Sequence, residues 1–238
     1  MPKFSLERRV PSCLVTKELL SALEGYLQLE LFKKLGEALG DKIDYGISIK
    51  ETIGTETLTD VSEYTPNDFS DATRAVQIRW ANGYNASCRL DIAIDFDSDY
   101  FLSKLKVDCT APTARETAVG IGDGILRVLD AYRTYNWVFN PFKFPMVTFF
   151  SGSLALGLLA WGAAIVISNR SLSLYALAAA VFLGWVYFSA GYFKPFISFD
   201  SRRQRLLDKL WRYFSIGTFG FVFFGTLLPL VRKVIAGF

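Results

Sequence analysis

The chain has 238 residues, 51% of them hydrophobic, and its 26 Lys+Arg against 23 Asp+Glu give a formal net charge of +3. It contains no histidine, which excludes histidine-based activation of a nucleophile and most zinc sites. Cys13, Cys88 and Cys109 show no paired spacing, which is typical of a reducing compartment rather than of a disulfide framework.

The charges are divided unevenly along the chain. Residues 1–143 hold 17 Lys+Arg and 21 Asp+Glu, whereas residues 144–238 hold 9 and 2. A basic region beside a membrane attracts anionic head groups, and it also attracts other polyanions. Residues 1–9 lack the apolar core of a signal peptide, so we expect the acidic half to stay in the cytosol.

A long amphipathic helix is predicted over residues 16–39. Thr16 is its expected N-cap, and Gly40 follows its last turn. Leucines recur at helical spacing in Leu20, Leu23, Leu27 and Leu31. We expect this helix to lie on a sheet; the alternative is a helix that binds a partner or a second copy.

The strands are predicted from alternation of apolar and polar residues. Residues 43–50 alternate in this way, Gly54 turns the chain into a weaker strand at 55–59, and residues 62–70 form a loop. Further strands are expected at 76–80, 88–96 and 105–109.

Two local signals complete the first half. Asn82-Gly83 predicts a two-residue type I′ hairpin turn, and Thr113 with Glu116 predicts a capping box that opens a final helix. Residues 1–143 are therefore predicted to form an α+β regulatory domain: a helix, four to five mostly antiparallel strands, and a second helix.

Two apolar runs predict a transmembrane helical hairpin over residues 144–193. Phe144–Asn169 has 26 residues without a charge, Ser171–Phe193 has 23, and only Arg170 separates them. About 20 apolar helical residues span a bilayer. Small residues that bring helices together are Ser153, Gly157, Ala160 and Ala164 in the first run and Ala176, Ala180 and Gly184 in the second.

Residues 194–213 are predicted to form a basic helix at the membrane surface. Ser201–Gln204 is a second capping box, and Leu207, Leu210 and Trp211 share a face. The candidates for contact with an anionic ligand or with lipid are Arg202, Arg203, Arg205, Lys209 and Arg212. They either set membrane topology or form a ring in an oligomer.

Residues 214–238 are predicted to form a third transmembrane or re-entrant helix, which gives a transmembrane region of two to three helices. Its weakly polar stripe provides the pore-lining candidates Ser215, Thr218, Val222, Gly225, Thr226 and Pro229. The distribution of Lys and Arg around the spans places the first domain in the cytosol of a multi-pass inner-membrane protein. If the third segment spans, Arg232 and Lys233 lie on the wrong side; either they snorkel to the outer head groups, or the segment is re-entrant.

Two motifs are interpreted as structural. Asp95, Asp97 and Asp99 are spaced like carboxylates of a calcium loop, but Tyr100 and Lys106 occupy its Gly and Glu positions, so we expect a solvated turn and no metal. The glycines at 120, 122 and 124 lie inside the final predicted helix and not after a strand, so we interpret them as close helix–sheet contacts rather than a dinucleotide site. No cofactor and no enzymatic activity are expected.

A regulatory domain fused to apolar spans resembles, across the whole chain, the transmembrane effectors of bacterial anti-phage systems. It is similar to the Hailong type, in which a nucleotidyltransferase partner makes an oligonucleotide that controls a membrane channel. The resemblance implies a homo-oligomeric channel that responds to a nucleotide or single-stranded oligonucleotide. A tetramer is the favoured oligomer. The alternative is a membrane-anchored adaptor or assembly protein whose first domain binds a protein partner.

Overall fold

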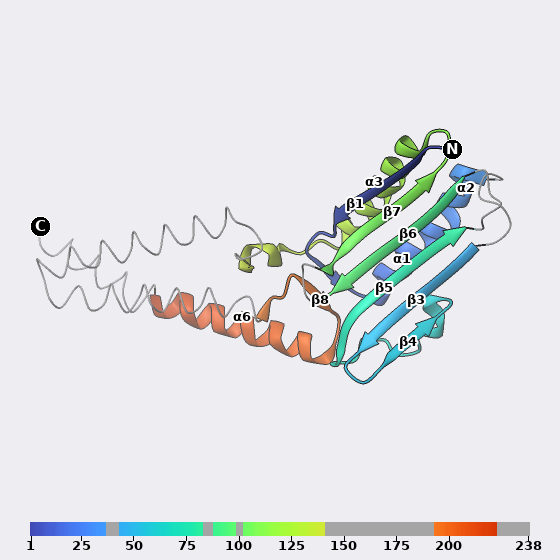
Figure 1. Cartoon of the computed structure of the whole chain (residues 1–238). Coiled ribbons are helices and arrows are strands. Elements are labelled where there is room, and N and C mark those ends of the chain that lie inside the picture. Colours follow the sequence, from blue (N-terminus) through green and yellow to red (C-terminus); the bar gives the residue numbers. More distant parts are fainter. Residues whose placement is uncertain (37–42, 83–87, 99–101, 141–192, 223–238) are drawn as a thin grey trace, which may run out of the picture. The chain divides into compact units, whose positions relative to one another are not determined.

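The computed structural model describes residues 1–36, 43–82, 88–98, 102–140 and 193–222 (Figure 1). The chain forms two compact units. The first comprises Met1–Tyr135 and Phe196–Gln204, and the second comprises Asn136–Pro195 and Arg205–Phe238. Each unit is described by itself.

The first unit is built on a six-stranded antiparallel sheet with the order β1-β7-β6-β5-β3-β4 (Figure 1). Its strands are β1 (Lys3–Arg9), β3 (Ile43–Glu51), β4 (Thr55–Leu58), β5 (Thr73–Asn82), β6 (Arg89–Asp97) and β7 (Lys104–Thr110). The predicted turn at Gly54 is confirmed, since Glu51 N donates to Gly54 O at 2.8 Å between β3 and β4. The edge strand β1 was not predicted.

The helices cover one face of this sheet (Figure 1). The predicted first helix consists of α1 (Lys17–Gly25), the π-helical turn η1 (Tyr26–Glu30) and α2 (Leu31–Leu35). Its N-cap is confirmed, because Thr16 Oγ1 accepts a hydrogen bond from Leu19 N at 3.1 Å. The C-cap of α2 is Gly36, whose φ of 49° suits glycine, whereas the predicted stop at Gly40 lies outside the described residues. The second covering helix is α3 (Ala114–Ala131).

The core lies between the sheet and these helices. Val76, Ile78 and Trp80 on β5 point into it and are fully buried, as alternation predicts. Burying a large apolar side chain contributes about 1.5–3 kcal/mol, so this layer supplies much of the favourable free energy of folding. The outward residues of the same strands are mainly polar, as expected where one face of an antiparallel sheet meets water.

A small parallel sheet joins two distant parts of the chain in the first unit. β2 (Cys13–Val15) pairs with β8 (Ile197–Phe199). The buried Ser12 hydroxyl donates to Phe196 O at 3.0 Å, and Thr134 N donates to Ser12 O at 2.8 Å. Short 3₁₀ turns occur at η3 (Val61–Glu63) and at η5 (Tyr135–Phe139).

The hairpin between β5 and β6 differs from the prediction. Ala81 pairs with Asp91, so a two-residue turn at Asn82-Gly83 is wrong. The side chain of Asn82 explains the difference, because its Nδ2 donates to Cys88 O at 2.6 Å and its Oδ1 accepts from Leu90 N at 2.7 Å. The Asn82 side chain therefore continues the hydrogen bonding between β5 and β6 beyond the last backbone pair.

The predicted capping box at Thr113 and Glu116 is also wrong. Thr113 precedes α3, but its side chain makes no capping hydrogen bond. Its hydroxyl lies 3.4 Å from that of Thr117 instead. A hydroxyl engaged one turn along the helix does not satisfy the first free N–H groups.

The longest helix of the structure is α6 (Arg202–Val222). It runs without interruption through position 213, where the sequence predicted a boundary between a surface helix and a third span. Within the described residues, no helix combines the length and apolar character needed to cross a bilayer. The predicted fold class, an α+β domain followed by a transmembrane region of two to three helices, is therefore contradicted; the α+β part is present.

The same finding contradicts the predicted multi-pass inner-membrane localisation. The hairpin predicted at 144–193 lies outside the described residues except for Phe193, and so do all seven small residues assigned to its packing.

Candidate functional site

Helix α6 begins inside the first unit and is fixed there by two side chains. Ser201 Oγ accepts from Gln204 N at 3.2 Å, which confirms the Ser side of the predicted capping box. Asp71 Oδ1 accepts from Arg203 N at 2.7 Å. A carboxylate at this position also interacts favourably with the positive end of the helix dipole.

The exposed side of α6 is strongly basic. All five basic candidates, at positions 202, 203, 205, 209 and 212, are exposed. The only acidic residue of the helix is Asp208, whose Oδ1 lies 2.6 Å from Lys194 Nζ. Because Asp208 is already paired with Lys194, it offsets little of the charge on the exposed side.

Large apolar side chains are exposed beside these charges. Leu206 and Leu210 are each 55% exposed, Tyr213 is 73% exposed and Ile216 is 65% exposed. At about 100° per residue, positions 206, 210 and 213 fall within an arc of roughly 60°, and the arc of Lys209 and Arg212 adjoins it. The exposed face of α6 therefore combines an apolar arc with a basic arc.

The opposite side of α6 packs within the second unit. The rings of Phe193 and Trp211 lie 5.8 Å apart, and those of Trp211 and Phe214 lie 5.9 Å apart. Among the pore-lining candidates, Ser215 donates its hydroxyl to Trp211 O at 2.7 Å, the local bond expected of serine inside a helix. Thr218 and Val222 belong to α6, whereas Gly225, Thr226 and Pro229 lie outside the described residues.

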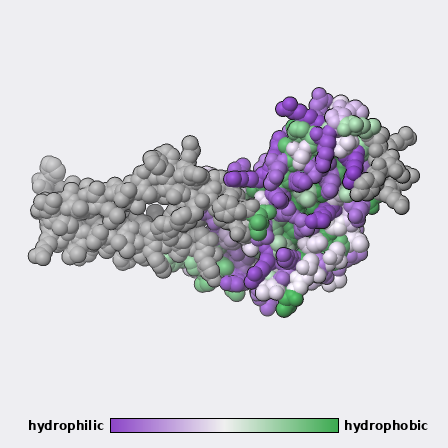
Figure 2. Space-filling view, viewed as in Figure 1, coloured by the Kyte–Doolittle hydropathy of each residue, from purple (hydrophilic) through white to green (hydrophobic). Residues whose placement is uncertain are grey.

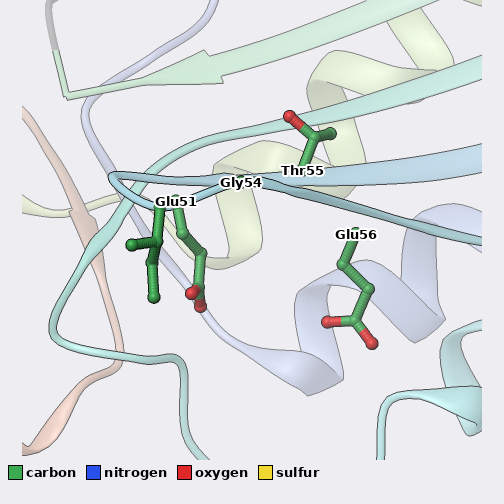
Figure 3. Close-up of a pocket in the computed structure, with 5 residues that line it drawn as sticks. Glu51, Gly54, Thr55 and Glu56 are labelled. Carbon is green, nitrogen blue, oxygen red and sulfur yellow. The ribbon is translucent and has the colours of Figure 1, made fainter.

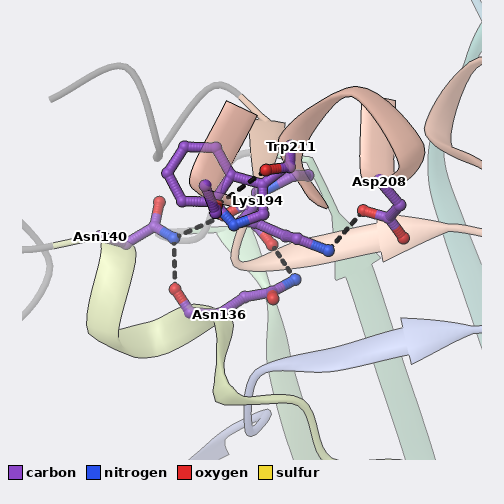
Figure 4. Close-up of polar contacts among 7 residues, drawn as sticks. Asn136, Asn140, Lys194, Asp208 and Trp211 are labelled. Atoms are coloured by element: carbon purple, nitrogen blue, oxygen red, sulfur yellow. Dashed lines mark hydrogen bonds and ion pairs between the residues drawn. The ribbon is translucent and has the colours of Figure 1, made fainter. Parts of the chain in front are cut away.

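A cluster of polar side chains ties two segments of the second unit together (Figure 4). Asn140 Nδ2 donates to Asn136 O at 2.7 Å and to Lys194 O at 3.0 Å. Asn136 Nδ2 donates to Pro195 O at 3.0 Å. Residues 136–140 and 194–195 therefore lie side by side, although the bonded residues are 54 and 59 positions apart in the sequence.

The uncovered face of the sheet holds a residue that sequence reasoning missed. Figure 2 shows this face mainly in the colours of hydrophilic residues. Arg79 lies on the central strand β5, directly across from Gly46 on β3 and Ala93 on β6. Neither Gly46 nor Ala93 has a side chain large enough to cover the guanidinium of Arg79, and Arg79 is exposed. Within the described part, no carboxylate lies at ion-pair distance from it.

Polar groups surround Arg79 at neighbouring positions of the same face. Asp91 and Asp95 flank Ala93 along β6, and Gln77 Nε2 donates to Asp95 Oδ1. Lys106 lies across from Ala93 on β7, and its Nζ is 2.7 Å from Asp108 Oδ2. The face therefore offers the guanidinium of Arg79, the carboxylates of Asp91 and Asp95 and the amide of Gln77, beside the Lys106–Asp108 pair.

Ion pairing shifts the pKa values of the two charged groups on β7. Partial burial of Asp108 opposes its ionisation, but the hydrogen bond and charge of Lys106 outweigh this and lower the pKa of the carboxyl below its usual value. The same pairing raises the pKa of Lys106. Both groups are therefore charged at neutral pH.

The remaining candidates offer no assembled chemistry. The turn after Asp97 is held by Ser103, whose hydroxyl donates to Asp97 O at 3.0 Å and accepts from Asp97 N at 2.9 Å. Asp99 lies outside the described residues. No group of three His, Cys, Asp or Glu suited to a metal occurs in the described part of the chain. Burial raises the pKa of Cys13 and of Cys109 to about 12, which keeps these thiols protonated.

A shallow depression occurs at the β3–β4 hairpin and is lined by Glu51, Ile53, Gly54, Thr55 and Glu56 (Figure 3). The carboxylates of Glu51 and Glu56 point to the same side of the hairpin without converging. Such an arrangement does not assemble a binding site for a small ligand.

Comparison of the chain with protein-family models, curated proteins and solved structures finds no match.

Proposed function

We propose that the chain is a non-catalytic effector of an anti-phage defence system, regulated by a nucleotide or oligonucleotide that a nucleotidyltransferase partner makes. The first unit is the sensor, and α6 is the output element that begins in it. The proposal includes a homo-oligomer, with a tetramer as the expected size. It includes no channel, because the predicted transmembrane region is contradicted.

Arg79 is the observation that carries this proposal. An exposed guanidinium between Gly46 and Ala93 leaves room for a phosphate to approach and accept two parallel hydrogen bonds. The carboxylates of Asp91 and Asp95 are suited to the amino groups of bases, which donate hydrogen bonds. A ligand with both a phosphate and a base fits this combination better than a simple polyanion does.

Fluorescence anisotropy tests this assignment on the full chain. The probes are labelled single-stranded homopolymers of each deoxynucleotide and labelled ATP. We expect Arg79→Ala to weaken binding by about 10- to 100-fold, the range for loss of hydrogen bonds to a charged group. Arg115→Ala is the matched control, because Arg115 is an exposed arginine on α3. Equal binding by the wild type and Arg79→Ala would exclude the assignment.

A protein-binding adaptor is the second candidate. The uncovered face carries charges of both signs, including the Lys106–Asp108 pair, and such mixed surfaces suit a protein partner. If Arg79→Ala abolishes co-purification of a protein from a phage-infected host and none of the nucleotide probes binds, the adaptor function replaces the effector function.

A further inference from the structure

We propose that the exposed face of α6 docks on the surface of an anionic lipid bilayer, with the helix axis lying along the surface rather than across it. The face comprises the apolar arc of Leu206, Leu210 and Tyr213 and the basic arc that adjoins it. This inference is independent of the ligand proposed at Arg79.

The apolar arc requires an occupant that removes it from water. Leu206, Leu210 and Tyr213 are more than half exposed and follow one another at intervals of four and three residues. Clustered exposed apolar side chains mark interaction surfaces, whereas single ones do not. Tyr213 suits a boundary between apolar and aqueous phases, since its ring is apolar and its hydroxyl is polar.

The basic arc determines which occupant fits. Lys209 and Arg212 lie beside the apolar arc, and Arg202 lies one to two turns before Lys209 on the same side. An anionic bilayer covers both arcs at once, because the leucines enter the boundary of head groups and acyl chains while the long basic side chains reach the phosphates. A soluble polyanion would cover the cations and leave Leu206 and Leu210 in water.

Pairing with a second copy of α6 is disfavoured by the same charges. In an antiparallel pair packed through the apolar arcs, the basic arcs of the two helices would lie on the same side. The only carboxylate of the helix, Asp208, is already paired with Lys194. The repulsion therefore has no compensating partner on the helix.

The test places an environment-sensitive fluorophore on the full chain. Cys13, Cys88 and Cys109 are buried, so a thiol-reactive probe labels an introduced surface cysteine selectively. Tyr213→Cys reports on α6, and Leu29→Cys is the control, because Leu29 is 63% exposed on η1 of the first unit. The vesicles contain phosphatidylcholine alone or phosphatidylcholine with 30% phosphatidylglycerol, a composition chosen on the order of that of anionic membranes.

We expect the probe at 213 to shift to shorter wavelength with the anionic vesicles only, and the probe at 29 to stay unchanged. In the 213-labelled protein, Lys209→Gln with Arg212→Gln should raise the lipid concentration that gives half of the maximal wavelength shift by about thirtyfold. Each basic residue near such a surface contributes about 1 kcal/mol to binding, and the double variant removes two. Lys104→Gln with Arg89→Gln, on the sheet, should leave it unchanged.

Three results would overturn the proposal. An unchanged probe at 213 excludes docking, and an equal shift with neutral vesicles excludes the role of the basic arc. If Leu206→Ser with Leu210→Ser reduces the oligomer size in the absence of vesicles, the face is an interface between copies of this chain.

Discussion

The hydroxyl of Tyr26 lies so close to where a Cβ of residue 124 would stand that the two atoms would overlap. Gly124 on α3 and Tyr26 at the start of the π-helical turn therefore fit together only because residue 124 has no side chain. Gly122 makes a similar contact, since its Cβ would lie 2.6 Å from Leu6 Cδ2. The predicted close contact between helix and sheet is confirmed at Gly122, which faces Leu6 of β1. At Gly124 the close neighbour is Tyr26 of another helix. Gly120 has nothing within 4 Å of its Cβ position.

This contact gives the first prediction. Gly124→Ala should lower the free energy of unfolding by about 1–3 kcal/mol, because the added methyl group overfills the contact. Gly120→Ala should raise it by about 0.5–1 kcal/mol, because alanine favours the helix. Denaturant unfolding of the full chain, followed by fluorescence, measures both. Tyr26→Phe should recover only part of the loss in Gly124→Ala, because Tyr26 Cζ and Cε2 would still lie 2.5 and 2.9 Å from the added methyl group. In a Tyr26→Ala background, which lacks the ring, Gly124→Ala should cost much less, and an equal cost in both backgrounds would contradict the contact.

The second prediction concerns pH. Burial raises the pKa of Glu24, and the hydrogen bond from Val61 N at 3.3 Å only partly offsets it. A carboxyl with a raised pKa binds its proton more tightly in the folded state, so its ionisation lowers stability as pH rises from the unfolded pKa through the folded one. Glu24→Gln should therefore equal or exceed the wild type in stability at pH 7, and lose this advantage below about pH 4.

Glu18 provides a control of opposite sign. The N–H of its own backbone and the Thr16 hydroxyl lower the pKa of Glu18 at the start of α1. Its contribution to stability is present above its unfolded pKa and lost as pH falls through the folded one. Glu18→Gln should thus be less stable than the wild type at pH 7. Identical pH profiles for the two variants would show that neither carboxyl behaves as described.

The third prediction separates the two capping motifs. Ser201→Ala should cost about 1 kcal/mol of stability, since it removes the acceptor for the Gln204 N–H in a buried setting. Thr113→Ala should change stability by less than about 0.5 kcal/mol, because Thr113 does not cap α3. Thermal unfolding of the two variants side by side checks this. Equal losses would contradict the difference between the two helix starts.

The fourth prediction tests the polar cluster of the second unit. Asn140→Asp replaces the amide that donates to two carbonyl oxygens by a group that, when ionised, only accepts. The amides of Phe193, Lys194 and Phe196 should then exchange hydrogen faster by at least about tenfold, the effect of losing about 1.4 kcal/mol of local stability. Asn67→Asp, in an exposed loop, is the control. Unchanged exchange would mean that other contacts hold these segments.

Local patterns predicted most of the first unit. Alternation identified the buried side of β5 through Val76, Ile78 and Trp80, and the capping residue Thr16 located the start of α1. The same reasoning missed β1 because Arg8, on its inward side, breaks the apolar alternation. In the structure, Arg8 forms an ion pair with Asp123 of α3. That pairing depends on tertiary structure, which a single strand's sequence does not contain.

The candidate sites show the same limit. The basic residues of α6 were identified from composition and spacing. That an exposed apolar arc lies beside them became clear only from the exposure of each side chain in the structure. Arg79 was recognised only as an outward residue of a strand. Its neighbours Gly46 and Ala93 depend on strand register, which no local motif specifies. The transmembrane assignment relied on the length of apolar runs alone, and no described helix meets that requirement.

The parallel pairing of β2 with β8 also sets an order of events during synthesis. Cys13–Val15 leaves the ribosome long before Ile197–Phe199 is made, and about 180 residues take roughly 10–40 s to translate at 5–20 residues per second. Throughout this interval Ser12 lacks its acceptor at Phe196. The nascent sheet domain therefore stays incomplete until a segment about 180 residues further along the chain has been made, and a product truncated before residue 197 would lack the partner of β2.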